Sequence, residues 1–239
     1  MFGHLLMSTP AALLPPNEAE RLATLRHYNI LTAPPEGVFL SLTAFAAHLF
    51  AVPLSFVALV DEHEVCFPVA HGMERMRSMP RAQALCATAI LHTHPVVYEN
   101  LSAAPQAGPD GEAIRSALAL GNGFYAAAPL RMPDGHSIGV LCLASPAPRQ
   151  LSAAEQDTLS DIADLTALVI AVRHLCLATP ELGADEWRVA SGQLQQALAA
   201  LRIQSNESRS QHELQTQVPE TVLQAVRKGL LALRITLAE

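Results

Sequence analysis

The sequence predicts an α/β (α+β) sandwich, in which a central, mainly antiparallel sheet has helices on both sides. Two β-hairpins carry this prediction. In the first, residues 54–60 and 65–70 are nearly all apolar and are joined by a short polar turn. In the second, strands 123–131 and 138–143 flank Pro133-Asp134-Gly135, where the glycine can adopt the positive φ of a tight turn. The third observation is that helical patterns precede, separate and follow the two hairpins.

Composition limits the classes of protein to which the chain can belong. Of its 239 residues, 50% are hydrophobic and 15% are charged, which predicts a well-buried core. The formal net charge is -7 and no Lys/Arg cluster occurs, so nucleic-acid binding by a basic patch is excluded. No uncharged apolar run reaches the roughly 18 residues of a membrane span, and the N-terminus lacks a secretory pattern. Four cysteines without a Cys-x-x-Cys pair indicate reduced thiols, so we expect a cytoplasmic protein without nucleic-acid or membrane partners.

The N-terminal part of the chain predicts an arm and two helices. We expect residues 1–16, which end in a Leu-Leu-Pro-Pro run, to be a flexible arm. Asn17 then has the character of a helix N-cap, with Glu20 as its capping-box partner. A second helix is expected over residues 36–50, because apolar residues recur there at spacings of three and four: Val38, Leu42, Phe45 and Leu49.

The segment between the two hairpins predicts short elements. Residues 71–81 are expected to be irregular, and residues 82–92 to form a helix. A short strand is expected at 96–98, and the Pro-, Ala- and Gly-rich residues 100–111 predict a loop. A further helix over 112–120 leads into the second hairpin.

After the second hairpin the pattern becomes helical. Ser152 and Glu155 predict a capping box at the start of a long helix that runs to about Leu177 and completes a domain over residues 17–178. Residues 179–239 then form a C-terminal helical extension. Its apolar residues follow helical spacing: Trp187, Leu194, Leu198, Leu201, Val222, Val226, Leu230, Leu233 and Leu237.

Two amphipathic helices are therefore expected in this extension, with residues 205–217 as a polar hinge and residues 220–239 as the second helix. Their apolar faces need a surface to pack against. Folding back on the domain and self-association both provide one, and the sequence leaves both open.

Several motifs together resemble a known family. They follow one another in chain order: Asn17-Glu18-Ala19-Glu20-Arg21-Leu22, Pro34-Pro35-Glu36, Leu59-Val60-Asp61, Leu85-Cys86-Ala87, Phe124-Tyr125-Ala126 and Gly139-Val140-Leu141-Cys142. With these motifs, residues 17–175 resemble a group of bacterial GAF domains. The resemblance implies a sensory or regulatory module with a six-stranded sheet and a ligand-sized pocket. Such domains often precede histidine kinases or cyclic-nucleotide enzymes, which implies a kinase or cyclase as a possible partner protein.

The chain also departs from that family pattern at three places. Cys66 stands where a Trp often precedes the Phe of the second strand, Thr88 replaces a common His, and Ser145 replaces an acidic residue at the end of the last strand. These departures argue against the polar ligands of related domains.

The resemblance places a pocket between one face of the sheet and a cover formed by residues 71–92 and 98–121. The side chains expected nearest to a ligand are Phe67, Arg81, Cys86, Tyr98 and Tyr125. Such a pocket would favour a small, partly apolar molecule. In the alternative, Met73, Met76 and Met79 fill the pocket, and the domain serves only for dimerisation.

Thiol chemistry is a second interpretation of the same region. Some GAF relatives reduce free methionine sulfoxide with cysteines, and others hold a bilin through one. The reductase needs a thiol of low pKa, and Arg75 or Arg81 could supply positive charge to Cys86. We expect Cys66 and Cys86 to act instead as small apolar side chains, and Cys142 and Cys176 to be inert.

No set of histidines has the spacing of a metal site, so no metal is expected. The prediction is a cytoplasmic sensory or regulatory protein that binds an unidentified small molecule or a partner and relays a signal through its terminal helices. It is expected to form a homodimer through helices 152–177 and 181–239. The alternatives are a thiol-dependent reductase of a small sulfoxide that uses Cys86 or Cys66, and a haem- or bilin-binding sensor.

Overall fold

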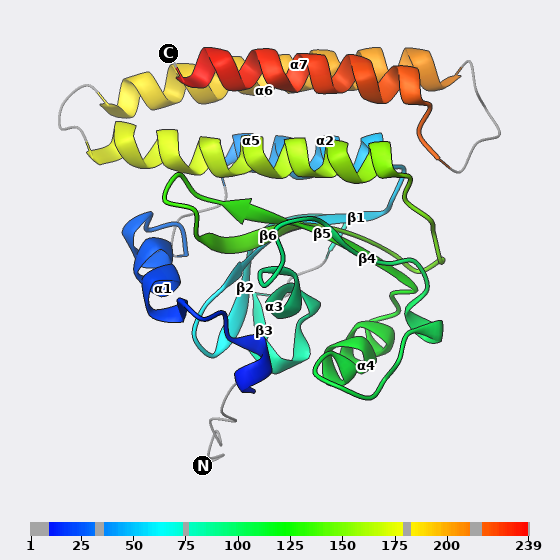
Figure 1. The fold of residues 1–239 in the computed structure, drawn as a ribbon. Coiled ribbons are helices and arrows are strands. Elements are labelled where there is room, and N and C mark those ends of the chain that lie inside the picture. The colour runs from blue at the N-terminus through cyan, green and yellow to red at the C-terminus, as the bar shows by residue number, and fades with distance from the viewer. Residues whose placement is uncertain (1–9, 32–35, 74–76, 179–182, 211–216, 239) are drawn as a thin grey trace.

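The computed structural model describes residues 10–31, 36–73, 77–178, 183–210 and 217–238. Figure 1 shows a central sheet with long helices stacked on one face and short helices on the other. The expected sandwich is confirmed.

Six strands of the described chain form one sheet in the order β3-β2-β1-β6-β5-β4, and all neighbours pair antiparallel. Their bounds are β1 Leu54–Val60, β2 Glu64–His71, β3 Ser78–Pro80, β4 Val96–Tyr98, β5 Phe124–Arg131 and β6 Ser137–Ser145. Both expected hairpins, β1–β2 and β5–β6, are present.

The described chain contains seven α-helices: α1 Glu18–His27, α2 Gly37–Leu49, α3 Leu85–Ala89, α4 Gly111–Ala119, α5 Ala153–Ala178, α6 Gly183–Ser210 and α7 Glu220–Ala238. Short 3-10 helices lie at Ala11–Leu13, Arg81–Gln83 and Leu101–Ala103.

The β5–β6 hairpin depends on two glycines. Gly135 has a φ of 90°, and its N–H donates to the carbonyl oxygen of Met132 over 2.8 Å, which closes the turn. Gly139 lies so close to β1 that a Cβ at this position would be 2.2 Å from the carbonyl oxygen of Ala58. A side chain at Gly139 would therefore force the two strands apart.

The alternation of side chains along the strands divides the interior into two cores. On β5, Phe124, Ala126 and Ala128 belong to the first core, between the sheet and helices α2 and α5. Tyr125 and Ala127 belong to the second core, between the sheet and helices α3 and α4. The two faces of the sheet are therefore both buried, but against different partners.

Helices α6 and α7 form an outer layer over α2 and α5 (Figure 1). We call these four helices the four-helix layer. The residues of α6 and α7 that join the first core are buried: Trp187, Leu194, Leu198, Val222, Leu223, Val226 and Leu230. In the described part of the extension, α6 and α7 therefore fold back on the domain, which is one of the two expected arrangements. Self-association stays a prediction.

Carboxylates join helices at both ends of this layer, and of the two, Glu155 is fully buried and Glu36 is partly buried. Glu155 forms the expected capping box, because Ser152 N donates to its carboxylate over 2.9 Å and Ser152 Oγ accepts from Glu155 N over 3.2 Å. The same carboxylate accepts from Arg149 Nη2 over 2.6 Å and from the backbone N–H of Val218 over 3.1 Å. Because Val218 lies just before α7, Glu155 fixes the start of α7 beside the start of α5.

At the opposite end the carboxylate belongs to Glu36, just before α2. It accepts from Arg173 Nε on α5 over 2.6 Å and from Trp187 Nε1 on α6 over 2.7 Å. One side chain therefore joins three helices of the layer.

Ion pairs follow the seam between α5 and α7. Arg227 pairs with Asp161 over 2.7 Å and with Asp157 over 3.2 Å, and Arg234 pairs with Asp164 over 3.1 Å. These side chains are partly exposed, so each pair adds little stability. Their main effect is to fix how the two helices lie against each other.

The pocket-side cover differs from the sequence prediction. Residues 78–80 form the edge strand β3 within the segment expected to be irregular, where Met79 pairs with Val65. The expected helix 82–92 is broken, because extended Ala84 separates a 3-10 turn from the five residues of α3. Helix 112–120 and strand 96–98 are confirmed within one residue.

Two predictions at the termini also need correction. In the described part of the expected arm, Leu13 is buried in the second core and anchors this segment to the domain, while residues 1–9 lie outside the described chain. Helix α6 continues to Ser210 through the start of the expected hinge, where the buried hydroxyl of Ser205 finds a partner within the helix by donating to the carbonyl of Arg202 over 2.8 Å. Residues 211–216 of that hinge lie outside the described chain. Asn17 precedes α1 but its side chain makes no capping hydrogen bond.

Candidate functional site

A cavity of about 280 Å³ lies on the second-core face of the sheet, and we call it the sheet pocket. Strands β1, β2, β5 and β6 form its floor, and its cover consists of α3, α4 and the residues Gly72, Met73 and Met79. Its lining includes Phe56, Phe67, Met79, Cys86, Ala117 and Tyr125. No charged side chain is among the described residues that line it. The pocket is therefore suited to a small, neutral and largely apolar molecule.

Space for the cavity comes from small side chains. Ala113 and Ala117 of α4 and Ala144 of β6 face the cavity, where larger residues would fill it. Met73 and Met79 form part of the wall and do not close the space, whereas Met76 lies outside the described residues. The described methionines therefore do not fill the pocket, in contrast to the alternative prediction.

Of the five side chains expected near a ligand, the structure brings three to the sheet pocket: Phe67, Cys86 and Tyr125. Tyr98 lies opposite Tyr125 in the sheet, with ring centroids 6.4 Å apart, but does not line the cavity. Its hydroxyl donates to Asp110 Oδ2 over 2.6 Å, and burial together with this carboxylate raises the pKa of Tyr98. Tyr98 therefore supports the wall of the pocket through Asp110.

Arg81 was expected at the pocket, and the structure places it elsewhere. Its side chain is fully buried, and its guanidinium donates to the Glu18 carboxylate over 2.5 Å and to the carbonyls of Asp61 and Leu13 over 3.1 and 2.9 Å. Arg21 also donates to Glu18, through Nε and Nη2, both over 2.8 Å. Burial would raise the pKa of Glu18, but the hydrogen bonds from Arg21 and Arg81 outweigh it and lower that pKa. Arg81 therefore ties the N-terminal segment to the sheet.

Cys66 does not meet the requirement of a reactive thiol. It is half-buried on β2, does not line the described cavity, and donates to Glu64 Oε1 over 3.8 Å. Burial and the negative charges of Glu64 and Asp61 raise the pKa of Cys66 to about 11. A reductase needs the opposite shift, so the surroundings of Cys66 do not support the alternative in which it is the reactive thiol. Arg75 lies outside the described residues.

Cys86 lies beside a second thiol, that of Cys142, which was predicted to be inert. The sulfur atoms of Cys86 and Cys142 are 3.8 Å apart, and both residues are buried. Tyr125 Oη is 3.3 Å from Cys86 Sγ and 3.4 Å from Cys142 Sγ. The contact follows from the register of the sheet, because Ala144 pairs with Tyr125, and Cys142, two residues earlier on β6, lies on the same face.

The two thiols differ in acidity. Hydrogen bonding by the Cys142 thiol, aided by the Tyr125 hydroxyl, outweighs burial and lowers the pKa of Cys86. Burial, together with Cys86, raises the pKa of Cys142 well above its usual range. Cys86 is therefore the thiol that ionises first, and it is also the one that lines the cavity.

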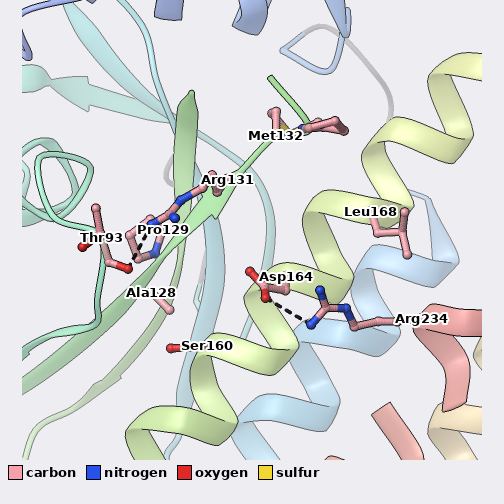
Figure 2. Close-up of a pocket in the computed structure, with 10 residues that line it drawn as sticks. Thr93, Ala128, Pro129, Arg131, Met132, Ser160, Asp164, Leu168 and Arg234 are labelled. Carbon is pink, nitrogen blue, oxygen red and sulfur yellow. Dashed lines mark hydrogen bonds and ion pairs between the residues drawn. The ribbon is translucent and has the colours of Figure 1, made fainter. Parts of the chain in front are cut away.

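A larger cavity of about 420 Å³ lies on the other side of the molecule, between the end of β5 and helices α5 and α7. Figure 2 shows Arg131 and Thr93 on one wall and Asp164 and Arg234 on the other. Arg131 Nη2 donates to the carbonyl of Thr93 over 3.0 Å, and Arg234 pairs with Asp164. Because both cations already have partners in the chain, we take the sheet pocket as the candidate site.

Two further classes of site find no support in the described part of the chain. No group of three or more His, Cys, Asp and Glu side chains there could hold a metal ion. No helix among the described residues is long and apolar enough to cross a membrane.

Comparisons with known proteins agree with this architecture. A family profile described as a GAF domain matches residues 32–171. The cyclic di-GMP phosphodiesterase PA2567 of Pseudomonas aeruginosa is 27% identical over 143 residues, which are 60% of this chain and 23% of that protein. The matched region is therefore less than a quarter of that relative.

Similar solved structures have low sequence identity. The GAF domain of an Acinetobacter phosphoenolpyruvate-protein phosphotransferase has a TM-score of 0.48 at 16% identity, over 67% of this chain and 98% of that one. The blue-light absorbing PixJ GAF domain of Thermosynechococcus elongatus gives 0.47 at 17%, over 64% and 90%. A type II free methionine-R-sulfoxide reductase from Thermoplasma acidophilum gives 0.45 at 17%, over 56% and 92%.

Proposed function

The chain belongs to the GAF domain family, and we propose that it is a sensory or regulatory domain that binds a small, largely apolar molecule in the sheet pocket. The observation that supports this most is the cavity of about 280 Å³, which is apolar and uncharged in its described lining. It is close to the lower end of the volumes that small-molecule sites usually have. The ligand is therefore expected to be smaller than a nucleotide.

A path for the signal follows from the two faces of β5. Tyr125 faces the sheet pocket, whereas its neighbours Phe124 and Ala126 pack in the first core, where α5 lies against the strand. A ligand that moves Tyr125 would thus shift β5 against α5. Helix α7, joined to α5 by ion pairs and by Glu155, would move with it.

The output is proposed to pass from these helices to a separate catalytic protein, such as a kinase or cyclase. We further propose a cytoplasmic location, supported by four cysteines that are all unpaired in the structure. A homodimer remains part of the proposal. Since most apolar side chains of α6 and α7 pack within the chain, a dimer would use exposed ones on α7 such as Leu231 and Ile235.

The ligand-binding proposal can be tested with a matched pair of variants on α4. A small-molecule library is first screened against the full chain for an increase in thermal stability. Ala117→Leu should then weaken binding of the hit by about tenfold or more, since the added methyl groups enter the cavity. Ala119→Leu, on the same helix but exposed, should bind as the parent does. If Ala117→Leu leaves the affinity for the hit unchanged, the hit does not bind in the sheet pocket.

Thiol-dependent reduction of a small sulfoxide is the second candidate, and the position of Cys86 on the pocket wall favours it. This candidate predicts turnover of free methionine sulfoxide with dithiothreitol as reductant, which Cys86→Ser should abolish. The sensory proposal predicts no turnover. A haem or bilin sensor would instead give the purified protein a visible absorption band.

A further inference from the structure

Two cysteines that are 56 residues apart in the chain meet beside the sheet pocket. Cys86 comes from α3 and Cys142 from the central strand β6, and their sulfur atoms are 3.8 Å apart. Only Cys86 lines the cavity, so Cys142 lies behind it as seen from the pocket. A disulfide bond is about 2.05 Å long, so the sulfur atoms would need to approach by about 1.8 Å to form one.

Tyr125 completes the arrangement. Its hydroxyl lies within 3.4 Å of both sulfur atoms and can donate to whichever of them carries negative charge. Burial raises the pKa of Tyr125 well above its usual range, so the hydroxyl keeps its proton. A thiolate at Cys86 would thus be stabilised by two neutral donors in a site that holds no cation among its described lining residues.

We propose that Cys86 and Cys142 are a redox pair that an apolar organic hydroperoxide, entering through the sheet pocket, converts into a disulfide. In the first step the Cys86 sulfur attacks the terminal oxygen of the hydroperoxide and the O–O bond breaks. The products are Cys86 sulfenic acid and an alcohol, which takes the proton that the Cys86 thiol loses. In the second step the Cys142 sulfur attacks the Cys86 sulfur, and the hydroxyl group leaves as water with the Cys142 proton. The two thiols together supply the two electrons that reduce the peroxide.

The lining of the pocket selects the class of oxidant. An uncharged apolar wall favours an organic hydroperoxide over glutathione disulfide, which is bulky and charged and would be desolvated without a partner. The inference uses the same pocket as the proposed function, but it does not require a resident ligand. A disulfide would tie α3 to β6 and withdraw the Cys86 sulfur from the wall, so the pocket would change shape on oxidation.

The experiment uses the reduced full chain and cumene hydroperoxide in stoichiometric amount, with intact mass and peptide mapping under non-reducing conditions. The expected result is the loss of two hydrogen masses and a peptide in which Cys86 is linked to Cys142. The Cys142→Ser variant should instead yield a dimedone adduct on Cys86, because the sulfenic acid has no thiol to react with. Cys66→Ser and Cys176→Ser are the matched controls and should still form the bond.

Glutathione disulfide should react at least about tenfold more slowly than cumene hydroperoxide, because its charges must enter an apolar cavity. Mapping of the unaltered chain needs no variant to fold, so the outcome stays decisive if a cysteine variant is unstable. An unreacted mass, or a bond that involves Cys66 or Cys176, overturns the proposal. Faster oxidation by methionine sulfoxide than by the hydroperoxide also overturns it, in favour of the reductase. If the reduced chain binds a ligand but the pair is inert, this inference fails alone, and if the pair reacts but no ligand binds, the proposed function fails alone.

Discussion

The face of the sheet that packs on α2 and α5 is covered by long helices, whereas the opposite face is covered by short ones. Helices α5 and α6 have 26 and 28 residues, but α3 and α4 have only five and nine. The long helices pack over a continuous core and are joined by a carboxylate at each end, the fully buried Glu155 and the partly buried Glu36. The short ones meet the sheet through turns and small side chains, and they leave a cavity. The difference indicates that the first face is packed more continuously, whereas the second face leaves the space that we propose for a ligand.

The largest expected effect is on the four-helix layer, at Glu155. In Glu155→Gln, the amide NH₂ would face either the N–H of Ser152 at the Oε2 position or both Arg149 and the N–H of Val218 at the Oε1 position, and all of these groups are donors. Because the carboxylate is fully buried, we expect the free energy of unfolding to fall by about 3–5 kcal/mol. Urea denaturation measures this loss.

The matched control is Asp185→Asn, the same chemical change in the first turn of α6, where the carboxylate is largely exposed and pairs with Arg188. It should leave the free energy of unfolding nearly unchanged. If the free energy of unfolding fell equally in the two variants, burial of the Glu155 carboxylate would not be the reason for its effect on stability.

A smaller effect compares the packing of the two cores directly. Ala163→Leu adds volume to α5 in the first core, where Ala163 is fully buried, and should destabilise the chain by about 1–3 kcal/mol. Ala117→Leu adds the same groups to α4 beside the cavity, so it should be tolerated or slightly stabilising. Thermal unfolding of the two variants, side by side, checks the prediction. If the two variants are destabilised equally, the cavity beside Ala117 does not accommodate a larger side chain.

The smallest expected effect is a pH dependence at the edge of the four-helix layer. His174 on α5 lies 4.4 Å from His27 of α1 between ring centroids, and burial, His27 and Arg173 lower the pKa of His174. The unfolded chain therefore binds the proton more readily than the folded one. This contribution to stability is complete above about pH 6.5 and is lost as the pH falls through the lower pKa of the folded state.

Melting temperatures between pH 5 and 8 should then fall less steeply on the acid side in His174→Gln than in the parent. The exposed His94, changed in the same way, is the control and should leave the slope as it is. If the melting temperature of His174→Gln fell as steeply at acid pH as that of the parent, His174 would not be a source of the pH dependence.

The regular elements of the first core could be predicted from the sequence because their signals are local. Strand β1 has the predicted bounds Leu54–Val60, and the Ser152–Glu155 capping box is present as expected. Apolar spacing in the extension also identified most of the residues of α6 and α7 that are now buried. The pattern could not say whether those faces pack within one chain or between two, because both arrangements bury the same residues.

The candidate site was harder to predict because it depends on contacts between distant segments. Arg81 looked free to reach the pocket, but its partner Glu18 is 63 residues away in the sequence. Cys142 stands in an unbroken apolar run, where periodicity gives no face, and only the register with β5 places it near Cys86. Residues 78–80 were too few to give a strand pattern, and pairing with β2 makes them β3.

The ion pairs between α5 and α7 also set an axial register. Asp157 with Arg227 and Asp164 with Arg234 are both separated by 70 residues, so the two helices run in the same direction with one constant offset. A slide of α7 along α5 by one turn, about 5.4 Å, would separate Arg234 from Asp164, whereas Arg227 could keep a partner, because Asp157 and Asp161 lie one turn apart on α5 and both pair with it. If motion passes from the pocket to α7 as proposed, Arg227 could stay paired while the helices slide, and the loss of the Arg234–Asp164 pair would report the displacement.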